Sequence, residues 1–211
     1  WEITYKVFAN GIIKVDNRFV AEGTETPMIP RVGLRMQLSE ILNDLTYYGR
    51  GPEENYRDRR TSQFIGEYTT PIKDLYEPYI RPQENEHRTD IYWCALTTKQ
   101  KAGLLFIADR TFELNASNYL LGSLDSGETI DNGAPRTKET NHRHLTDPQP
   151  VKQVDMFIDY RMMGVGGDNS WGAIAHEPYL IRPGVENAIE YGFSIVPFDK
   201  KADYKNLIYQ Y

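Results

Sequence analysis

Apolar residues recur at every second position along much of the chain, which is the period of a half-buried β-strand. Between Ile3 and Val20, two such runs flank Asn10-Gly11, a dipeptide that tolerates positive φ, and together they predict a β-hairpin. The same pattern predicts strands at residues 31–38, 45–48, 90–97, 104–108, 111–114, 151–160, 188–196 and 204–209. No run keeps a helical period of 3.6 residues over three turns. The pattern therefore predicts an all-β fold with two sheets packed face to face.

Polar segments rich in glycine and proline separate these strands. Residues 49–56 are predicted to form a loop, residues 57–68 a polar segment with a short helical turn, and residues 118–140 a long exposed loop. The 211 residues contain no internal repeat, and we expect one domain, residues 1–211. The chain opens on Trp1 in a stretch of strand character, without an initiator methionine, so we expect it to be a fragment of a longer chain.

Composition excludes some functions. The net charge is −6 and no block of lysine and arginine occurs, which argues against binding to nucleic acid. No apolar run approaches the roughly 18 residues of a membrane-spanning helix. The single cysteine, Cys94, excludes an intrachain disulfide and is expected to be a small buried apolar residue. The compartment stays open between cytoplasm and periplasm.

One glycine-rich stretch, residues 163–172, contains four glycines and a single large aromatic residue, Trp171. Glycines let a backbone turn sharply and approach a ligand closely. A tryptophan among small polar residues can stack on the apolar face of a sugar ring. The alternative is that Trp171 plugs the edge of its own core, since large aromatic residues are mostly buried.

Two polar clusters could carry chemistry. Residues 84–90 contain carboxylates, a histidine and an arginine, and could act in acid–base catalysis or form a solvated, self-satisfied loop. Residues 141–144, Asn-His-Arg-His, could bind a metal through two histidines, but no third ligand stands at a usual spacing, which favours a structural role. No phosphate-binding loop and no Gly-x-Ser-x-Gly motif occurs.

Several blocks occur together in a specific order. They are Ile-Pro-Arg-Val-Gly-Leu at 29–34, Tyr-Gly-Arg-Gly-Pro-Glu-Glu-Asn-Tyr-Arg-Asp-Arg at 48–59, Pro-Tyr-Ile-Arg-Pro-Gln-Glu-Asn at 78–85, Asn-His-Arg-His-Leu at 141–145 and Gly-Val-Gly-Gly-Asp-Asn-Ser-Trp at 164–171. In this order they resemble the C-terminal domain, or small chain, of bacterial β-galactosidases of the family two glycoside hydrolases. The resemblance runs from about Trp1 to Pro197.

This resemblance implies a large antiparallel β-supersandwich of the galactose-mutarotase type. It also implies that the two catalytic glutamates and the Mg²⁺ ligands lie on a TIM barrel earlier in the same polypeptide. The fragment itself would then have no catalytic residue and no cofactor, and would meet the β-galactoside substrate only in the full-length enzyme, itself expected to be a homo-oligomer.

In the family the tryptophan of the last block reaches the mouth of the active site and stacks on the sugar, so the resemblance implies this role for Trp171. Asp168 and Asn169 are expected to shape its loop. Two alternatives stay open: an aldose-1-epimerase-like enzyme using His87 with Glu84, or His144, and a carbohydrate-binding module using exposed aromatic residues. Residues 122–138 look longer than the family's loop, and residues 200–211 run past the expected end of the domain.

Overall fold

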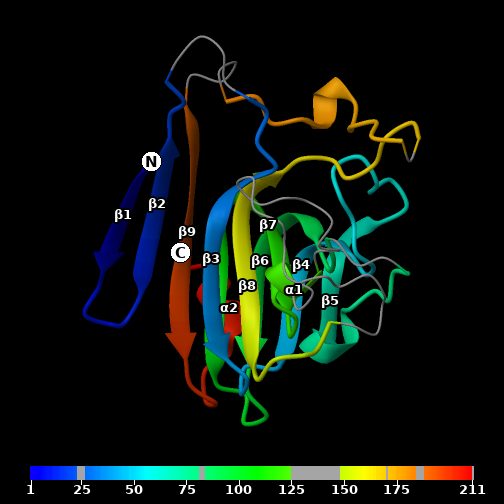
Figure 1. Cartoon of the computed structure of the whole chain (residues 1–211). Helices are drawn as coiled ribbons and strands as arrows, with labels where there is room; N and C mark the ends of the chain where they lie inside the picture. Colours follow the sequence, from blue (N-terminus) through cyan, green and yellow to red (C-terminus); the bar gives the residue numbers. More distant parts are fainter. Residues whose placement is uncertain (23–26, 81–83, 125–147, 170, 184–187, 211) are drawn as a thin grey trace.

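The computed structural model describes residues 1–22, 27–80, 84–124, 148–169, 171–183 and 188–210. Its strands are β1 (Glu2–Val7), β2 (Ile13–Phe19), β3 (Arg31–Ser39), β4 (Asp44–Gly51), β5 (Phe64–Pro71), β6 (Arg88–Thr97), β7 (Gly103–Ser117), β8 (Gln153–Met162) and β9 (Ile189–Phe198). The helical elements are α1 (Leu121–Leu124), α2 (Tyr204–Ile208) and two 3₁₀ turns, Ile72–Asp74 and Glu177–Tyr179. All strand pairs are antiparallel, which confirms the all-β prediction (Figure 1).

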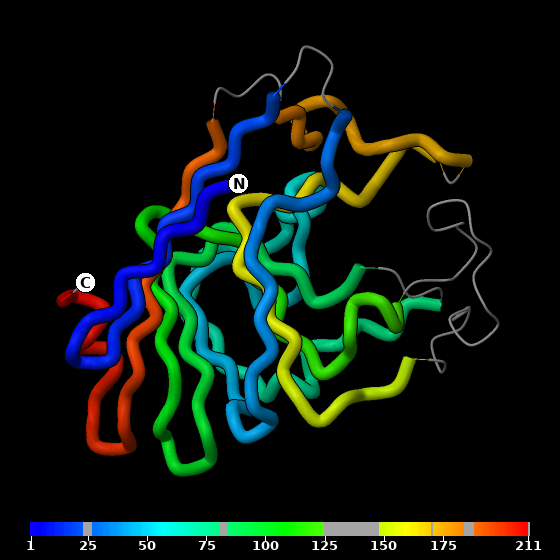
Figure 2. Tube along the Cα trace, turned by 60° about the vertical axis from the view of Figure 1, so that its left-hand side comes forward, coloured from blue at the N-terminus to red at the C-terminus, as the bar shows by residue number. Residues whose placement is uncertain are grey.

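The strands form one sheet that branches at the long strand β7. Along one edge β7 pairs with β6, and the path β1-β2-β9-β7-β6-β4-β5 runs through the sheet. Along the other edge of β7, residues 103–108 pair with β9, whereas residues 113–117 pair with β8, which in turn pairs with β3. The branch places β3 and β8 as a second layer in front of β6 and β4 (Figures 1 and 2).

The main core lies between these layers. It is formed by alternate side chains of both layers, among them Leu45, Tyr47, Ile91, Phe106, Phe112, Leu114, Val154, Met156, Ile158 and Phe193. A smaller cluster on the opposite face of β9, β7 and β6 contains Trp93, Leu105 and Phe198 and is covered by α2. Cys94 is free and fully buried, as expected, and burial raises the pKa of its thiol.

The hairpin around Asn10-Gly11 and the other period-two strands are confirmed in position, with four corrections. The two strands predicted at 104–108 and 111–114 are one strand, β7. Residues 49–51, predicted as loop, complete β4, and residues 64–68, predicted as a polar segment with a helical turn, belong to β5. Residues 204–208, predicted as strand, form helix α2.

Two of these corrections have a physical reason in the fold. Gly49 stands in β4 because a Cβ there would lie 2.4 Å from Cδ1 of Ile91 on the neighbouring strand, so the glycine serves close packing between strands. Residue Asp203 caps α2 by accepting a hydrogen bond from the Lys205 amide at 3.1 Å, which outweighs the strand preference of the tyrosines. Helix α2 then packs Tyr204 against Trp93 and Phe198.

Of the predicted loop 118–140, residues 121–124 form α1 and residues from 125 onward lie outside the described part of the chain. In the part that is described, no helix has the length and apolar character needed to cross a membrane.

Candidate functional site

The loop that follows β8, residues 163–175 without Ser170, is held by hydrogen bonds to three separate parts of the chain, at Pro30, Tyr179 and Asp58. At its start the Met163 amide donates to the Pro30 carbonyl at 2.9 Å, and the Gly164 amide donates to the Tyr179 carbonyl at 2.8 Å. A Cβ at Gly167 would lie 2.2 Å from the Ala173 carbonyl oxygen, so only glycine lets the two arms of the loop approach this closely.

The carboxylate of Asp58 holds the middle of this loop. Its Oδ1 accepts a hydrogen bond from the Val165 amide at 3.2 Å, and its Oδ2 accepts one from the Gly166 amide at 2.7 Å. A Cβ at Gly164 would lie 2.7 Å from Oδ2 of the same carboxylate, so the glycine makes room for it. Asp58 therefore fixes the loop from a position more than one hundred residues away in sequence.

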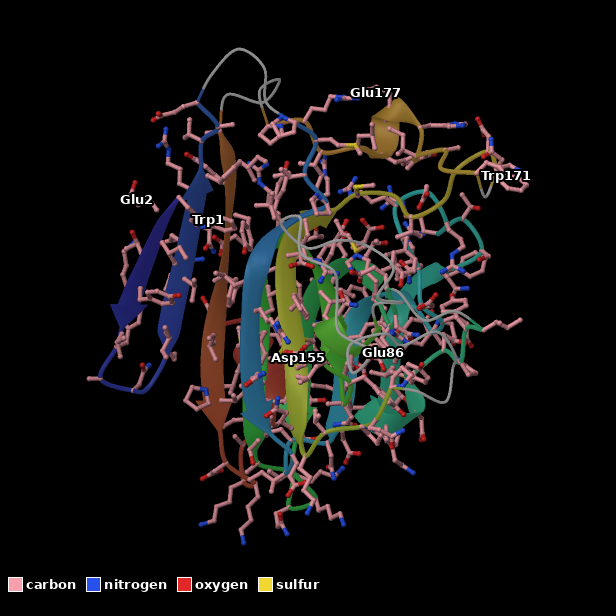
Figure 3. All side chains as sticks on the ribbon, in the orientation of Figure 1. Trp1, Glu2, Glu86, Asp155, Trp171 and Glu177 are labelled. Carbon is pink, nitrogen blue, oxygen red and sulfur yellow. The ribbon has the colours of Figure 1, made fainter. Side chains whose placement is uncertain are left out.

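Trp171 projects from the tip of the loop and is 92% exposed (Figure 3). Its amide donates to Oδ1 of Asn169 at 2.8 Å, and the following Gly172 adopts a positive φ of 96°. Asp168 pairs with the exposed His176 at 2.8 Å. Asn169 and Asp168 thus contact residues within and next to the loop, and Trp171 does not plug the core of the described chain. Ser170, between them, is not among the described residues.

A cavity of about 970 Å³ lies beside the loop, and its walls are mainly apolar. It is lined by Tyr56, Tyr79, Ile80, Met163, Val165 and Ile174, with Asp58, Arg59 and Glu84 as its charged residues. Ile80, Val165 and Ile174 are exposed. The candidate site is thus an open apolar depression with one exposed tryptophan on the adjoining loop.

The charged residues of this cavity all have partners elsewhere in the fold: Asp58 holds the loop, Glu84 pairs with Arg31, and Arg59 pairs with Glu54. Arg59 forms an ion pair with Glu54 at 2.5 Å and also donates to the Tyr79 hydroxyl at 3.0 Å. The Tyr79 hydroxyl in turn donates to Glu54. These contacts orient the wall of the cavity and give the one carboxylate among them, that of Glu54, two partners.

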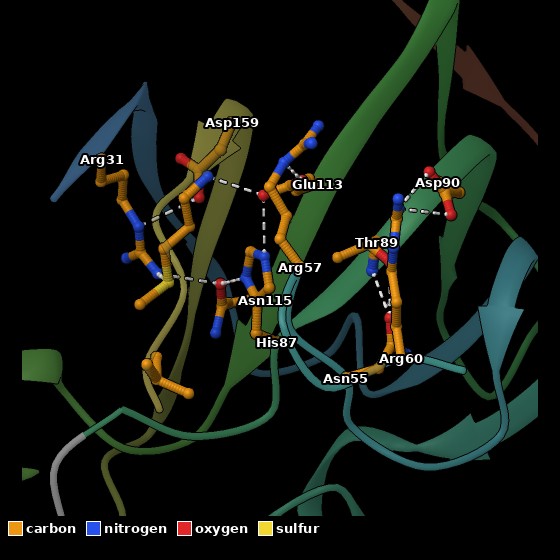
Figure 4. A network of polar contacts seen from close by, with 12 residues as sticks. Arg31, Asn55, Arg57, Arg60, His87, Thr89, Asp90, Glu113, Asn115 and Asp159 are labelled. Carbon is orange, nitrogen blue, oxygen red and sulfur yellow. Dashed lines mark hydrogen bonds and ion pairs between the residues drawn. The ribbon is translucent and has the colours of Figure 1, made fainter. Parts of the chain in front are cut away.

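Behind the cavity lies a buried polar network centred on His87 (Figure 4). The two ring nitrogens of His87 contact Oδ1 of Asn115 at 2.7 Å and Oε2 of Glu113 at 3.0 Å. Glu113 also accepts hydrogen bonds from Arg57 at 2.8 Å and from the Met162 amide at 2.6 Å. Burial favours the neutral acid, but the hydrogen bond with His87 and the charges of His87 and Arg57 hold the pKa of Glu113 below its usual value.

Arg31 extends the network toward the cavity. It forms ion pairs with Glu84 at 3.0 Å and with the fully buried Asp159 at 3.1 Å, and it donates to Asn115 at 3.2 Å. Burial raises the pKa of Asp159 to about 7, although the charge of Arg31 works in the opposite direction.

Asp90 and Thr89 of the 84–90 cluster serve the fold in a similar way. Asp90 accepts hydrogen bonds from Arg60 at 2.9 and 3.0 Å and from Arg50 at 2.7 Å. The Oδ1 of Asn55 accepts from both the amide and the hydroxyl of Thr89, at 3.0 and 2.7 Å. The cluster thus joins β6 to the segment before β5. The second cluster, residues 141–144, lies outside the described residues.

Among the described residues, no group of three or more histidine, cysteine, aspartate and glutamate side chains could hold a metal ion. A second cavity, of about 720 Å³, lies away from the loop, where β9 and β7 separate, and Arg18, Asp109, Arg161 and Glu190 are among its lining residues. Arg18 pairs with Glu190, and Lys14 pairs with Asp109, so these charges are partly used within the sheet.

Comparison with known proteins decides the family. A family model described as the β-galactosidase small chain matches residues 1–195. The chain belongs to this family. As a small chain, it is 32% identical over 179 residues to a β-galactosidase of Priestia megaterium and 32% identical over 177 residues to one of Vibrio cholerae, covering 85% and 84% of the chain. A β-galactosidase of Halalkalibacterium halodurans is 28% identical over 92% of the chain.

The small chain spans only 15–18% of the length of these relatives. The sequence pointed to Trp171, Asn169 and Asp168 as candidates, but not to Asp58, Arg59 and Tyr79 beside the same loop. These three residues lie in the sequence blocks 48–59 and 78–85 that carry the resemblance to the family. Their place in these blocks was the one sequence feature that could have pointed to them. Only the folded chain shows that both blocks meet the loop.

Proposed function

We propose that this chain is the non-catalytic C-terminal domain of a retaining β-galactosidase, an enzyme that hydrolyses terminal β-D-galactosides. The family and the names of the relatives support the enzyme class. In a retaining glycosidase one carboxyl group acts as acid and base and a second as nucleophile. We assign both groups, and the Mg²⁺ ligands, to a TIM barrel elsewhere in the same polypeptide. In this enzyme, itself a homo-oligomer, the small chain meets the substrate only together with that barrel.

Within this proposal Trp171 completes the mouth of the active site and stacks on the sugar, chiefly on its leaving-group side. The exposure of Trp171, at 92%, is the observation that carries the proposal, because a large aromatic side chain in water costs free energy unless a ligand or partner covers it. The ring has little rotamer freedom to lose on binding. Asn169 and Asp168 orient its loop through the contacts described above.

The apolar cavity beside the loop fits a contact with the catalytic domain. A tryptophan that reaches into an active site on another domain requires the surface around its loop to lie against that domain. Ile80, Val165 and Ile174 are exposed on this surface, and a uniformly polar surface would have argued against the contact.

Neither alternative function has comparable support. An epimerase needs an accessible histidine–carboxylate pair, but the described candidate, His87, is fully buried between Glu113 and Asn115. Glu84, its expected partner, instead pairs with Arg31. A carbohydrate-binding module with micromolar affinity needs about 8 kcal/mol, whereas one aromatic stacking contact supplies about 1–2 kcal/mol.

Two experiments test the proposal. The 211-residue chain alone should hydrolyse no chromogenic β-galactoside and should not accelerate galactose mutarotation. Hydrolysis would refute the non-catalytic role, and mutarotation alone would favour the epimerase.

In the full-length enzyme, Trp171→Ala should lower kcat/KM for lactose by roughly 5- to 30-fold, since about 1–2 kcal/mol of stacking is lost. Tyr209→Ala is the matched control, because Tyr209 is a similarly exposed aromatic residue at the C-terminal end of the described chain. Equal effects of the two substitutions would contradict the assignment of Trp171.

A further inference from the structure

Strand β1 exposes every one of its residues, although every second residue is apolar. Ile3, Tyr5 and Val7 alternate with Glu2, Thr4 and Lys6, which is the pattern of a strand with one side in a core. Tyr5 is 58% exposed and Val7 72% exposed. The sequence of β1 is thus suited to a buried side that nothing among the described residues covers.

The register of the sheet identifies this side. Tyr5 lies directly opposite Val15 of β2, and Val15 lies directly opposite Phe193 of β9. Directly opposed residues of antiparallel strands point to the same face. Val15 and Phe193 are buried in the main core, so the apolar residues of β1 continue the face that forms this core.

The second layer ends before it reaches β1. Its outer strand, β3, pairs with β8 only, and no described strand pairs with its other edge. Leu34, Met36 and Leu38 of β3 pack against the core but stay half-buried. In Figure 1, β3 lies over the centre of the molecule, whereas β1 and β2 extend beyond it on the left.

A buried amide lies on the same face. Asn17 of β2 is opposite Ile3 on one side and Tyr191 on the other, and it is only 5% exposed. Its Oδ1 and Nδ2 atoms have no hydrogen-bond partner among the described residues. Buried polar groups normally have partners, so an unsatisfied amide at this place fits a polar contact supplied by a strand that docks on this face.

We infer that the free edge of β3 and the core-facing side of β1 form a docking surface for one or more β-strands of the same polypeptide that lie outside residues 1–211. Such a strand pairs with β3, extends the second layer, and covers Ile3, Tyr5 and Val7 with its apolar side. The relatives supply the argument for this occupant, because the chain covers only 15–18% of their length and most of their residues are thus available to dock. The inference is independent of the role of Trp171.

Thiol labelling tests this surface. The native Cys94 is fully buried and does not compete for reagent, so Tyr5→Cys and Val7→Cys report on the core-facing side of β1. Lys6→Cys, on the opposite side of the same strand, is the matched control. Each variant is labelled with a maleimide both as the 211-residue chain and within the full-length polypeptide, and the modified peptide is quantified by mass spectrometry.

The cysteines at positions 5 and 7 should react at least ~10-fold more slowly in the full-length polypeptide, whereas the cysteine at position 6 changes little. Equal reactivity at positions 5 and 7 in both chains would overturn the inference. Protection that already occurs in the 211-residue chain, together with a dimer mass in solution, would show that a second copy is the occupant and would also overturn it. Hydrogen exchange of the unmodified proteins is the second measurement: slower exchange of β3 amides in the full-length polypeptide is expected, and unchanged exchange contradicts the docking.

Discussion

The role of Asp58 gives the most direct test of how the Trp171 loop is held. Asp58→Ala removes two hydrogen bonds, from the Val165 and Gly166 amides, at 3.2 and 2.7 Å. Both amides are exposed, so each bond is worth about 0.5–1 kcal/mol rather than the value of a buried charged contact. The loop should therefore open more easily by about 1–2 kcal/mol, which corresponds to a roughly 5- to 30-fold change in the opening equilibrium.

Amide hydrogen exchange measures this opening directly in the 211-residue chain. Exchange of the Val165 and Gly166 amides should accelerate by the stated factor in Asp58→Ala, whereas amides in the core strands should be unaffected. Asp74→Ala is the control, because Asp74 is an exposed carboxylate in a 3₁₀ turn away from the loop. Unchanged loop exchange would refute the reasoning, as would an equal acceleration throughout the sheet.

In the full-length enzyme the same substitution tests whether Asp58 is a positioning residue. If Asp58 acts by presenting Trp171, Asp58→Ala should lower kcat/KM for lactose, yet should add little to the loss already caused by Trp171→Ala. Additive losses in the double variant would show that Asp58 acts by another route.

Three further predictions concern the network and the loop. Glu113→Gln should lower the free energy of unfolding by about 3 kcal/mol in urea titrations, because Arg57 keeps a largely buried charge without its partner. Glu177→Gln, at an exposed ion pair, should cause no measurable change, and equal effects of the two substitutions would contradict the prediction. Burial raises the pKa of Glu86 to about 8, so the contribution of Glu86 to stability is complete below pH 4.5 and is lost as the pH rises toward 8. The free energy of unfolding of Glu86→Gln should therefore rise relative to that of the wild type by up to about 1.4 kcal/mol per pH unit in this range. A constant difference between the two proteins in urea titrations from pH 5 to 9 would refute the shift. Gly167→Ala in the full-length enzyme should lower kcat/KM about as much as Trp171→Ala, because its Cβ would lie 2.2 Å from a carbonyl oxygen and the loop must move; wild-type activity would contradict this.

Most of the sheet could be predicted from the sequence because alternate residues of its strands face the core, and this period of two is visible in the local sequence. The errors lie where a tertiary contact decides the local structure. Gly49 signals a loop by its residue type, but it is required by Ile91, which is 42 residues away in the chain. Tyr204 signals a strand, but the Asp203 cap and packing on Trp93 place it in a helix.

The candidate site could be predicted from the sequence only in part. A lone tryptophan among glycines could be identified from the local sequence, but its exposure could not, since large aromatic residues are mostly buried and the loop also contains Val165 and Ile174. The clamp by Asp58 could not be identified, since a carboxylate that binds amides more than one hundred residues away has no local pattern. The branching of β7 was hidden for the same reason, because the two strands that share its second edge, β8 and β9, come later in the chain.

The cluster at residues 84–90 shows why a chemically rich sequence need not be an active site. His87, Arg88, Thr89 and Asp90 direct their polar atoms to partners in the fold, and Glu84 pairs with Arg31. A group that left its partner to act on a substrate would leave a buried polar atom without a hydrogen bond. This loss costs about 1–3 kcal/mol, or more for a charge. These contacts therefore argue that the network supports the fold. Trp171 is in the opposite situation: its ring is exposed, so a ligand or partner can cover it without first breaking a contact within the described core.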